Sequence, residues 1–118
     1  MEINNDDFGG FIVSKNVIDG KPIRYTYREK STIPQLNGWT IYSMEDDDAY
    51  VNDSNNFVIL SAESVYQIAT LMIQIFDAPY GTDLCWKYDE KGQFAGFYDM
   101  NQRKETFIDD ILKKKSKK

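Results

Sequence analysis

Residues 23–28 read IRYTYR, a run in which apolar or aromatic residues alternate with polar or charged ones. A period of two with aromatic residues predicts a β-strand that buries one face. The residues expected to share that face are Ile23, Tyr25 and Tyr27. Residues 38–44, GWTIYSM, repeat the pattern, and we expect Trp39 to pack in the core. These two runs predict two neighbouring strands of one sheet.

Short apolar runs elsewhere in the chain predict the remaining strands. They lie at residues 11–13, 57–60, 82–88 and 93–98. The run at 57–60 is FVIL, which predicts a buried strand. Most connections, such as the turn DEKG at 89–92, are too short for a parallel crossover. The sequence therefore predicts an α+β fold with a mostly antiparallel sheet.

One long helix is predicted from Ser61, a good N-cap, to Phe76, ahead of Pro79. Its polar residues form one narrow stripe, made of Gln67, Thr70 and Gln74. A helix with so much apolar surface is expected to be buried on most sides. A short amphipathic C-terminal helix is predicted at 107–112. We therefore expect a single domain over residues 1–112, followed by a disordered Lys-rich tail at 113–118.

The composition excludes several classes of enzyme. The chain has 118 residues, 42% of them hydrophobic, with one cysteine and no histidine. A single thiol forbids an internal disulfide, and the lack of histidine excludes Ser-His-Asp catalysis and histidine-ligated zinc. Cys85 stands in an alternating strand, which is typical of an inert residue. No phosphate-binding loop occurs. The sequence predicts no catalytic residue and no cofactor.

Residues 45–56 interrupt the strand pattern with acidic residues and asparagines and contain no basic residue. The carboxylates are Glu45, Asp46, Asp47, Asp48 and Asp53. A calcium loop starting at Asp46 needs Gly and Glu where the sequence has Val51 and Phe57. We therefore predict no metal site, although clustered carboxylates leave weak Ca²⁺ or Mg²⁺ binding open. Acid–base catalysis would need two carboxyl groups in one cleft, which an exposed loop does not supply.

The charge distribution favours a basic protein as partner. The net charge is −5, and residues 1–112 carry 9 basic and 19 acidic residues, a net charge of −10. An acidic body repels nucleic acid and anionic membranes, although negative charge also keeps a protein soluble. Two tyrosines flank the acidic run, and tyrosine is a frequent interface anchor. The candidate partner-binding residues are Tyr42, Glu45, Asp46, Asp47, Asp48, Tyr50 and Asp53.

Targeting features predict a cytoplasmic protein. The first seven residues, MEINNDD, are acidic where a secretory signal is basic and then apolar. The longest uncharged stretches, residues 31–44 and 64–76, are 14 and 13 residues long. A helix that crosses a bilayer needs about 20 residues, so neither stretch is expected to cross one.

Four segments follow one another in a characteristic order. They are residues 27–30 (YREK), 38–43 (GWTIYS), 46–53 (DDDAYVND) and 78–82 (APYGT). Together they resemble the bacterial immunity protein 33-like family, also called domain of unknown function 2185, over about residues 10–99. The resemblance implies a small cytoplasmic domain, in some members an antidote encoded beside a polymorphic toxin. It supplies no catalytic residue.

Two function classes follow from this sequence. The first is a non-catalytic binding module, an immunity protein that neutralises a cognate bacterial toxin through an acidic, tyrosine-bearing surface. The second is a free-standing regulatory or small-ligand-binding domain. A toxin-like reading frame immediately upstream would favour the first class. An isolated gene, or a fusion to a sensor domain, would favour the second.

Overall fold

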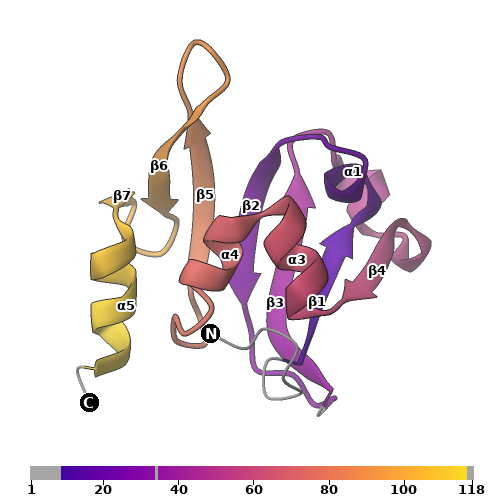
Figure 1. Cartoon of the computed structure of the whole chain (residues 1–118), viewed down its shortest axis with the longest axis horizontal. Coiled ribbons are helices and arrows are strands. Elements are labelled where there is room, and N and C mark those ends of the chain that lie inside the picture. The colour runs from indigo at the N-terminus through magenta and orange to yellow at the C-terminus, as the bar shows by residue number, and fades with distance from the viewer. Residues whose placement is uncertain (1–8, 34, 117–118) are drawn as a thin grey trace.

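The computed structural model describes residues 9–33 and 35–116, which contain one seven-stranded sheet (Figure 1). The strands are β1 (Gly10–Ser14), β2 (Ile23–Arg28), β3 (Leu36–Ser43), β4 (Phe57–Leu60), β5 (Asp83–Tyr88), β6 (Phe94–Asp99) and β7 (Lys104–Thr106). Their order across the sheet is β4-β1-β3-β2-β5-β6-β7. The β1–β3 pair is parallel, and the other described neighbours are antiparallel. The predicted α+β class with a mostly antiparallel sheet is confirmed.

Short helices connect the strands. They are α1 (Lys15–Ile18), α2 (Asp48–Val51), the 3-10 helix η2 (Ser54–Asn56), α3 (Ala62–Ile68), α4 (Thr70–Gln74) and α5 (Ile108–Ser116). Figure 1 shows α3 and α4 lying across one face of the sheet, with α5 beside β7. No helix among residues 9–33 and 35–116 combines the length and apolar character needed to cross a bilayer.

The C-terminal segment 113–118 was predicted to be a disordered tail. The helix α5 extends to Ser116, so its backbone includes the first residues of this segment. Residues 117–118 lie outside the described residues. The disorder of the tail therefore stays a prediction.

The segment predicted as one long helix forms two helices instead, α3 and α4. Ser61 caps α3 as predicted, but at Ala69 the backbone leaves the helical region (φ −153°, ψ 76°). Apolar residues surround most of this segment, so one straight helix cannot turn all of them toward the sheet. With the break, Val65 and Met72 are both fully buried, while Ile68 remains 43% exposed. The break therefore lets each short helix bury its own apolar side.

Strand β2 contains an irregularity that changes which face its side chains occupy. Its pairing with β3 shifts register between Ile23 and Tyr25. Ile23 and Thr26 are buried, whereas Tyr25 and Tyr27 are only half-buried and lie on the opposite face. The prediction that Ile23 shares a face with both tyrosines is therefore wrong. Trp86 Nε1 donates a 3.1 Å hydrogen bond to Thr26 Oγ1, which satisfies this polar group in the core.

Strand β4 has the predicted bounds without the predicted burial. It stands at one end of the strand order, and β1 is its neighbour in the described sheet. None of its four residues is buried, and Ile59 is 65% exposed. An apolar run does not reveal whether a strand is central or at an edge, because strand pairing decides that. The edge position leaves apolar side chains at the surface.

Trp39 is fully buried, as predicted. Its Nε1 donates to the carbonyl oxygen of Phe76 at 3.1 Å. Arg28 Nη1 donates to the same oxygen and to the carbonyl of Ala78, both at 2.9 Å. Burial lowers the pKa of Arg28, whose guanidinium lies 4.7 Å from the Tyr80 ring centroid. Arg28 therefore fastens the turn after α4 to strand β2.

Helices cover one face of the sheet, and the other face is largely open to solvent. The face under α3 and α4 carries Phe11, Trp39 and Ile41, all fully buried in one hydrophobic core. We call the opposite side the open face. By strand register, its residues on β4, β1, β3 and β2 include Phe57, Ile59, Ile12, Leu36, Thr40, Tyr42, Tyr25 and Tyr27. Of these, Thr40 is buried and the others are half-buried or exposed.

Candidate partner-binding site

The acidic segment, residues 45–53, folds into ordered turns. Asp47 caps α2 by accepting a 2.8 Å hydrogen bond from the backbone N–H of Tyr50. Asp53 caps η2 by accepting a 3.0 Å hydrogen bond from the backbone N–H of Asn55. Asp is a favourable N-cap because its side-chain oxygen satisfies a backbone donor at the start of a helix. Two of the predicted binding residues therefore also shape the segment.

Asp46 anchors the acidic segment to the rest of the fold. Its Oδ1 accepts a 2.8 Å hydrogen bond from Nδ2 of Asn16 in α1. Its Oδ2 accepts a 2.9 Å hydrogen bond from the backbone N–H of Ser43, at the end of β3. The side chain is half-buried. Hydrogen bonds to a charged acceptor contribute about 1.5–3 kcal/mol, so Asp46 contributes to folding whatever else it does.

Glu45 and Asp48 are the carboxylates left available to a partner. Both residues are exposed. In the described part of the chain, neither carboxylate has a hydrogen-bond or ion-pair partner. Within the acidic segment, these two charges therefore face solvent without a local structural role.

Four aromatic rings, which we call the aromatic row, connect the acidic segment to the open face. The ring of Tyr50 lies 6.2 Å from that of Phe57, and Phe57 lies 5.6 Å from Tyr42. Tyr42 in turn lies 5.6 Å from Tyr27, and the two hydroxyl oxygens are 3.1 Å apart. Burial, with the Tyr27 hydrogen bond as a second cause, raises the pKa of Tyr42. The Tyr42 phenol therefore stays neutral at physiological pH and presents an aromatic surface.

A hollow of about 480 Å³ lies beside the aromatic row. Its lining includes Ile12, Tyr27, Thr40, Tyr42, Phe57 and Ile59. Asn52 and Ser54 also line it, and they are the two neighbours of Asp53. None of the described lining residues is charged. The hollow is therefore an apolar depression whose rim adjoins the acidic segment.

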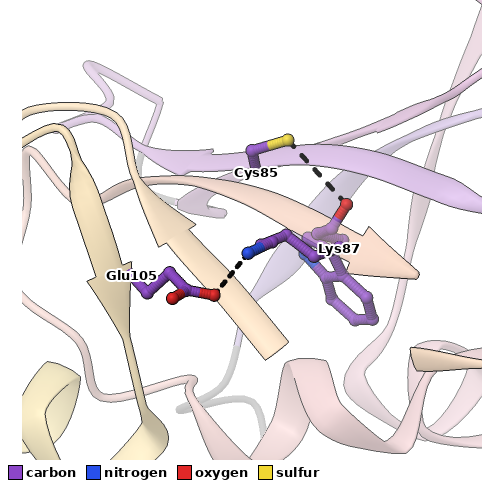
Figure 2. A network of polar contacts seen from close by, with 4 residues as sticks. Cys85, Lys87 and Glu105 are labelled. Atoms are coloured by element: carbon purple, nitrogen blue, oxygen red, sulfur yellow. Dashed lines mark hydrogen bonds and ion pairs between the residues drawn. The ribbon is translucent and has the colours of Figure 1, made fainter. Parts of the chain in front are cut away.

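The other end of the open face carries polar contacts (Figure 2). Lys87 Nζ forms an ion pair with Glu105 Oε1, and this hydrogen bond lowers the pKa of Glu105. Cys85 Sγ donates to the carbonyl oxygen of Trp86 at 3.8 Å. Among the described residues, no three acidic or cysteine side chains gather in a way that could hold a metal ion. The chemistry that these surfaces offer is recognition by charge, shape and aromatic contact.

The structure joins only some of the predicted site residues. Tyr42 and Tyr50 both contact Phe57. Of the five carboxylates, two cap helices, Asp46 holds the segment to the fold, and Glu45 and Asp48 have no partner among the described residues. Sequence reasoning missed Phe57, Tyr27 and Ile59, because it assigned all three to buried surfaces. An apolar run that directly follows an acidic segment is the signal that could have found Phe57 and Ile59. Binding by any of these residues stays a prediction.

Comparison with known proteins shows a family for this chain. A family model, described as the Immunity protein Imm33 domain, matches residues 11–97. That range contains the acidic segment and the aromatic row and stops within β6, so it leaves out β7 and α5. No curated protein and no solved structure gives a significant match.

Proposed function

This chain belongs to the immunity protein Imm33 family, and we propose from that premise that it protects a bacterial cell by binding and neutralising one cognate toxin. The single observation that carries the proposal is the family match, which covers well over half of the chain. The candidate surface lies wholly inside the matched range. A surface within the shared part of the fold is a reasonable place for a function common to the family.

The proposed binding surface is the acidic segment together with Tyr42 and Tyr50. Five carboxylates fall within nine residues, with no lysine or arginine among them. Such a patch attracts a basic surface over several ångströms and speeds association, most strongly at low ionic strength. Tyrosine supplies rigid aromatic area that loses little conformational entropy on binding. The partner is therefore a toxin domain that presents a basic surface.

The protein acts without catalysis, in the cytoplasm. The sequence lacks histidine, the commonest general base, and so has no imidazole to activate its single cysteine. Neutralisation by occlusion needs only affinity and a blocked toxin surface. The lone free thiol is typical of a protein from a reducing compartment.

A second candidate is a free-standing regulatory or small-ligand-binding domain. One observation favours it: the volume of the hollow, about 480 Å³, falls in the range of small-molecule pockets, about 300–1,000 Å³. The family match gives the toxin proposal the stronger support.

The test uses the toxin domain that this proposal expects to be encoded beside the gene. Cells that express this domain alone are expected to stop growing, and co-expression of the immunity protein is expected to restore growth. The two purified proteins are expected to co-elute as a complex. Persistent killing with no complex would contradict the proposal. A small molecule that co-purifies with the protein and stabilises it would support the second candidate.

A further inference from the structure

The hollow on the open face is an apolar depression that the described residues leave open to solvent. Its walls expose Ile59 and Ile33, whose accessible fractions are 65% and 51%. Its floor includes Thr40, which is buried between β1 and β2. Exposed apolar area of this kind on a small domain marks an interaction site more often than chance. The hollow therefore needs an occupant with apolar character.

The charge around the hollow favours a basic partner segment over a second copy of this chain as the occupant. The rim beside Asn52 and Ser54 adjoins Asp53, and the unpaired carboxylates of Glu45 and Asp48 belong to the same segment. A second copy of this chain docked on this face would bring two acidic segments together. Both chains are also negatively charged overall, so electrostatic repulsion opposes that dimer. A partner segment with lysine or arginine beside an apolar side chain fits both features: the apolar side chain can pack in the hollow, and the basic side chain can pair with the acidic rim.

We propose that the hollow receives a large apolar side chain of the toxin, from a segment that also carries lysine or arginine. The apolar side chain packs against Tyr42, Phe57 and Ile59, and the basic side chains meet Glu45 and Asp48. The volume of about 480 Å³ is ample for one large side chain with part of its backbone. This inference rests on the proposed function and adds the place and chemistry of the anchor.

The binding mode divides the work between two kinds of contact. Charged groups at the rim steer the encounter and set the association rate. A desolvated apolar anchor slows dissociation, because hot spots lie in well-packed pockets from which water is excluded. The aromatic row supplies ring edges and faces on one wall, which suit an aromatic or aliphatic anchor. Changes in the hollow should therefore alter the dissociation rate and leave the association rate nearly unchanged.

The experiment compares Ile59→Gln with Phe107→Gln by binding kinetics against the neighbouring toxin domain. The two residues have the same exposed fraction, 65%; Ile59 lies in β4 and Phe107 directly follows β7, the strand at the other end of the order. We expect Ile59→Gln to dissociate at least about tenfold faster and Phe107→Gln to match the wild type. Ile33→Gln, at a second exposed residue that lines the hollow, repeats the test from a loop position. Thermal melting of each variant checks that it is folded.

The outcomes separate this inference from the proposed function. A wild-type protein that neither binds nor protects contradicts the proposed function itself. A wild-type protein that binds, with Ile59→Gln and Ile33→Gln dissociating at the wild-type rate, overturns only the placement of the anchor. A wild-type dimer that Ile59→Gln dissociates, or a small molecule bound in the hollow, also overturns it.

Discussion

Trp39 and Thr40 are adjacent in β3, yet they serve opposite sides of the molecule. Trp39 is sealed beneath the helices and donates to the Phe76 carbonyl. Thr40 forms part of the floor of a hollow that is open to solvent. The alternation of a strand thus assigns neighbouring residues to different tasks. Substitutions on the core face should change stability, and substitutions on the open face or its rim should change binding.

The largest expected effect comes from Trp39→Ala on the core face. We expect the free energy of unfolding to fall by about 3–5 kcal/mol, because the substitution removes a fully buried ring and leaves a cavity. Urea denaturation measures this loss, and Thr40→Ser serves as the control on the other face. A near-neutral Trp39→Ala would break the comparison, because it would mean that the core face does not carry the stability.

Tyr50→Ala tests the end of the aromatic row. We expect complex dissociation to become about 30-fold faster, which corresponds to a hot-spot contribution of about 2 kcal/mol. Stability should fall less than in Trp39→Ala, since Tyr50 is only half-buried. Tyr66→Ala, which removes a tyrosine from the outer side of α3, is the matched control. Equal dissociation rates for both variants would move the interface away from the aromatic row.

The double variant Glu45→Gln/Asp48→Asn tests the rim. We chose these carboxylates because Asp46 and Asp47 hold local structure through their hydrogen bonds. Association at low salt should slow by about tenfold and lose part of its salt dependence, with the dissociation rate little changed. The control is Glu63→Gln/Glu90→Gln, which removes two exposed charges elsewhere. If the control slows association equally, steering comes from net charge and not from this segment.

The smallest effect is expected for deletion of residues 113–118. The free energy of unfolding should fall by no more than about 0.3–1 kcal/mol, which is the usual size of interactions between lysines and the C-terminal end of a helix. Deletion of residues 108–118 is the contrasting variant, because it also removes Ile111, which is buried. Calorimetry of both truncations measures the difference. If the two truncations lost similar amounts of stability, the stabilising contacts would lie within residues 113–118.

The sequence pattern within each segment predicted where the strands lie better than it predicted how they pair and pack. The bounds of β2 and β4 agree with the alternating and apolar runs, since these runs report backbone pleat and composition. The irregularity in β2, the break at Ala69 and the edge position of β4 depend on how distant segments pair and pack. A periodicity within one segment carries no information about those contacts. The acidic segment was located correctly, but its capping roles required the three-dimensional path.

The hollow itself was beyond the reach of the sequence for the same reason. Its lining comes from four strands, from Ile33 in a loop and from residues 51–54, and the order β4-β1-β3-β2 brings the strands together. Phe57 looked like a core residue because its run contains no polar position. Only the pairing of β4 with β1 turns Phe57 toward Tyr42 and Tyr50.

The placement of β1 between β3 and β4 also fixes an order of assembly during synthesis. Strand β1 leaves the ribosome first, but both of its neighbours in the sheet are made later, and the second is complete only at Leu60. Until then, the nascent chain has no partner for one edge of its earliest strand. Long-range pairings of this kind slow folding because a chain loop must close before they form. The protein thus gains the surface proposed to bind the toxin only after the first half of the chain has been translated.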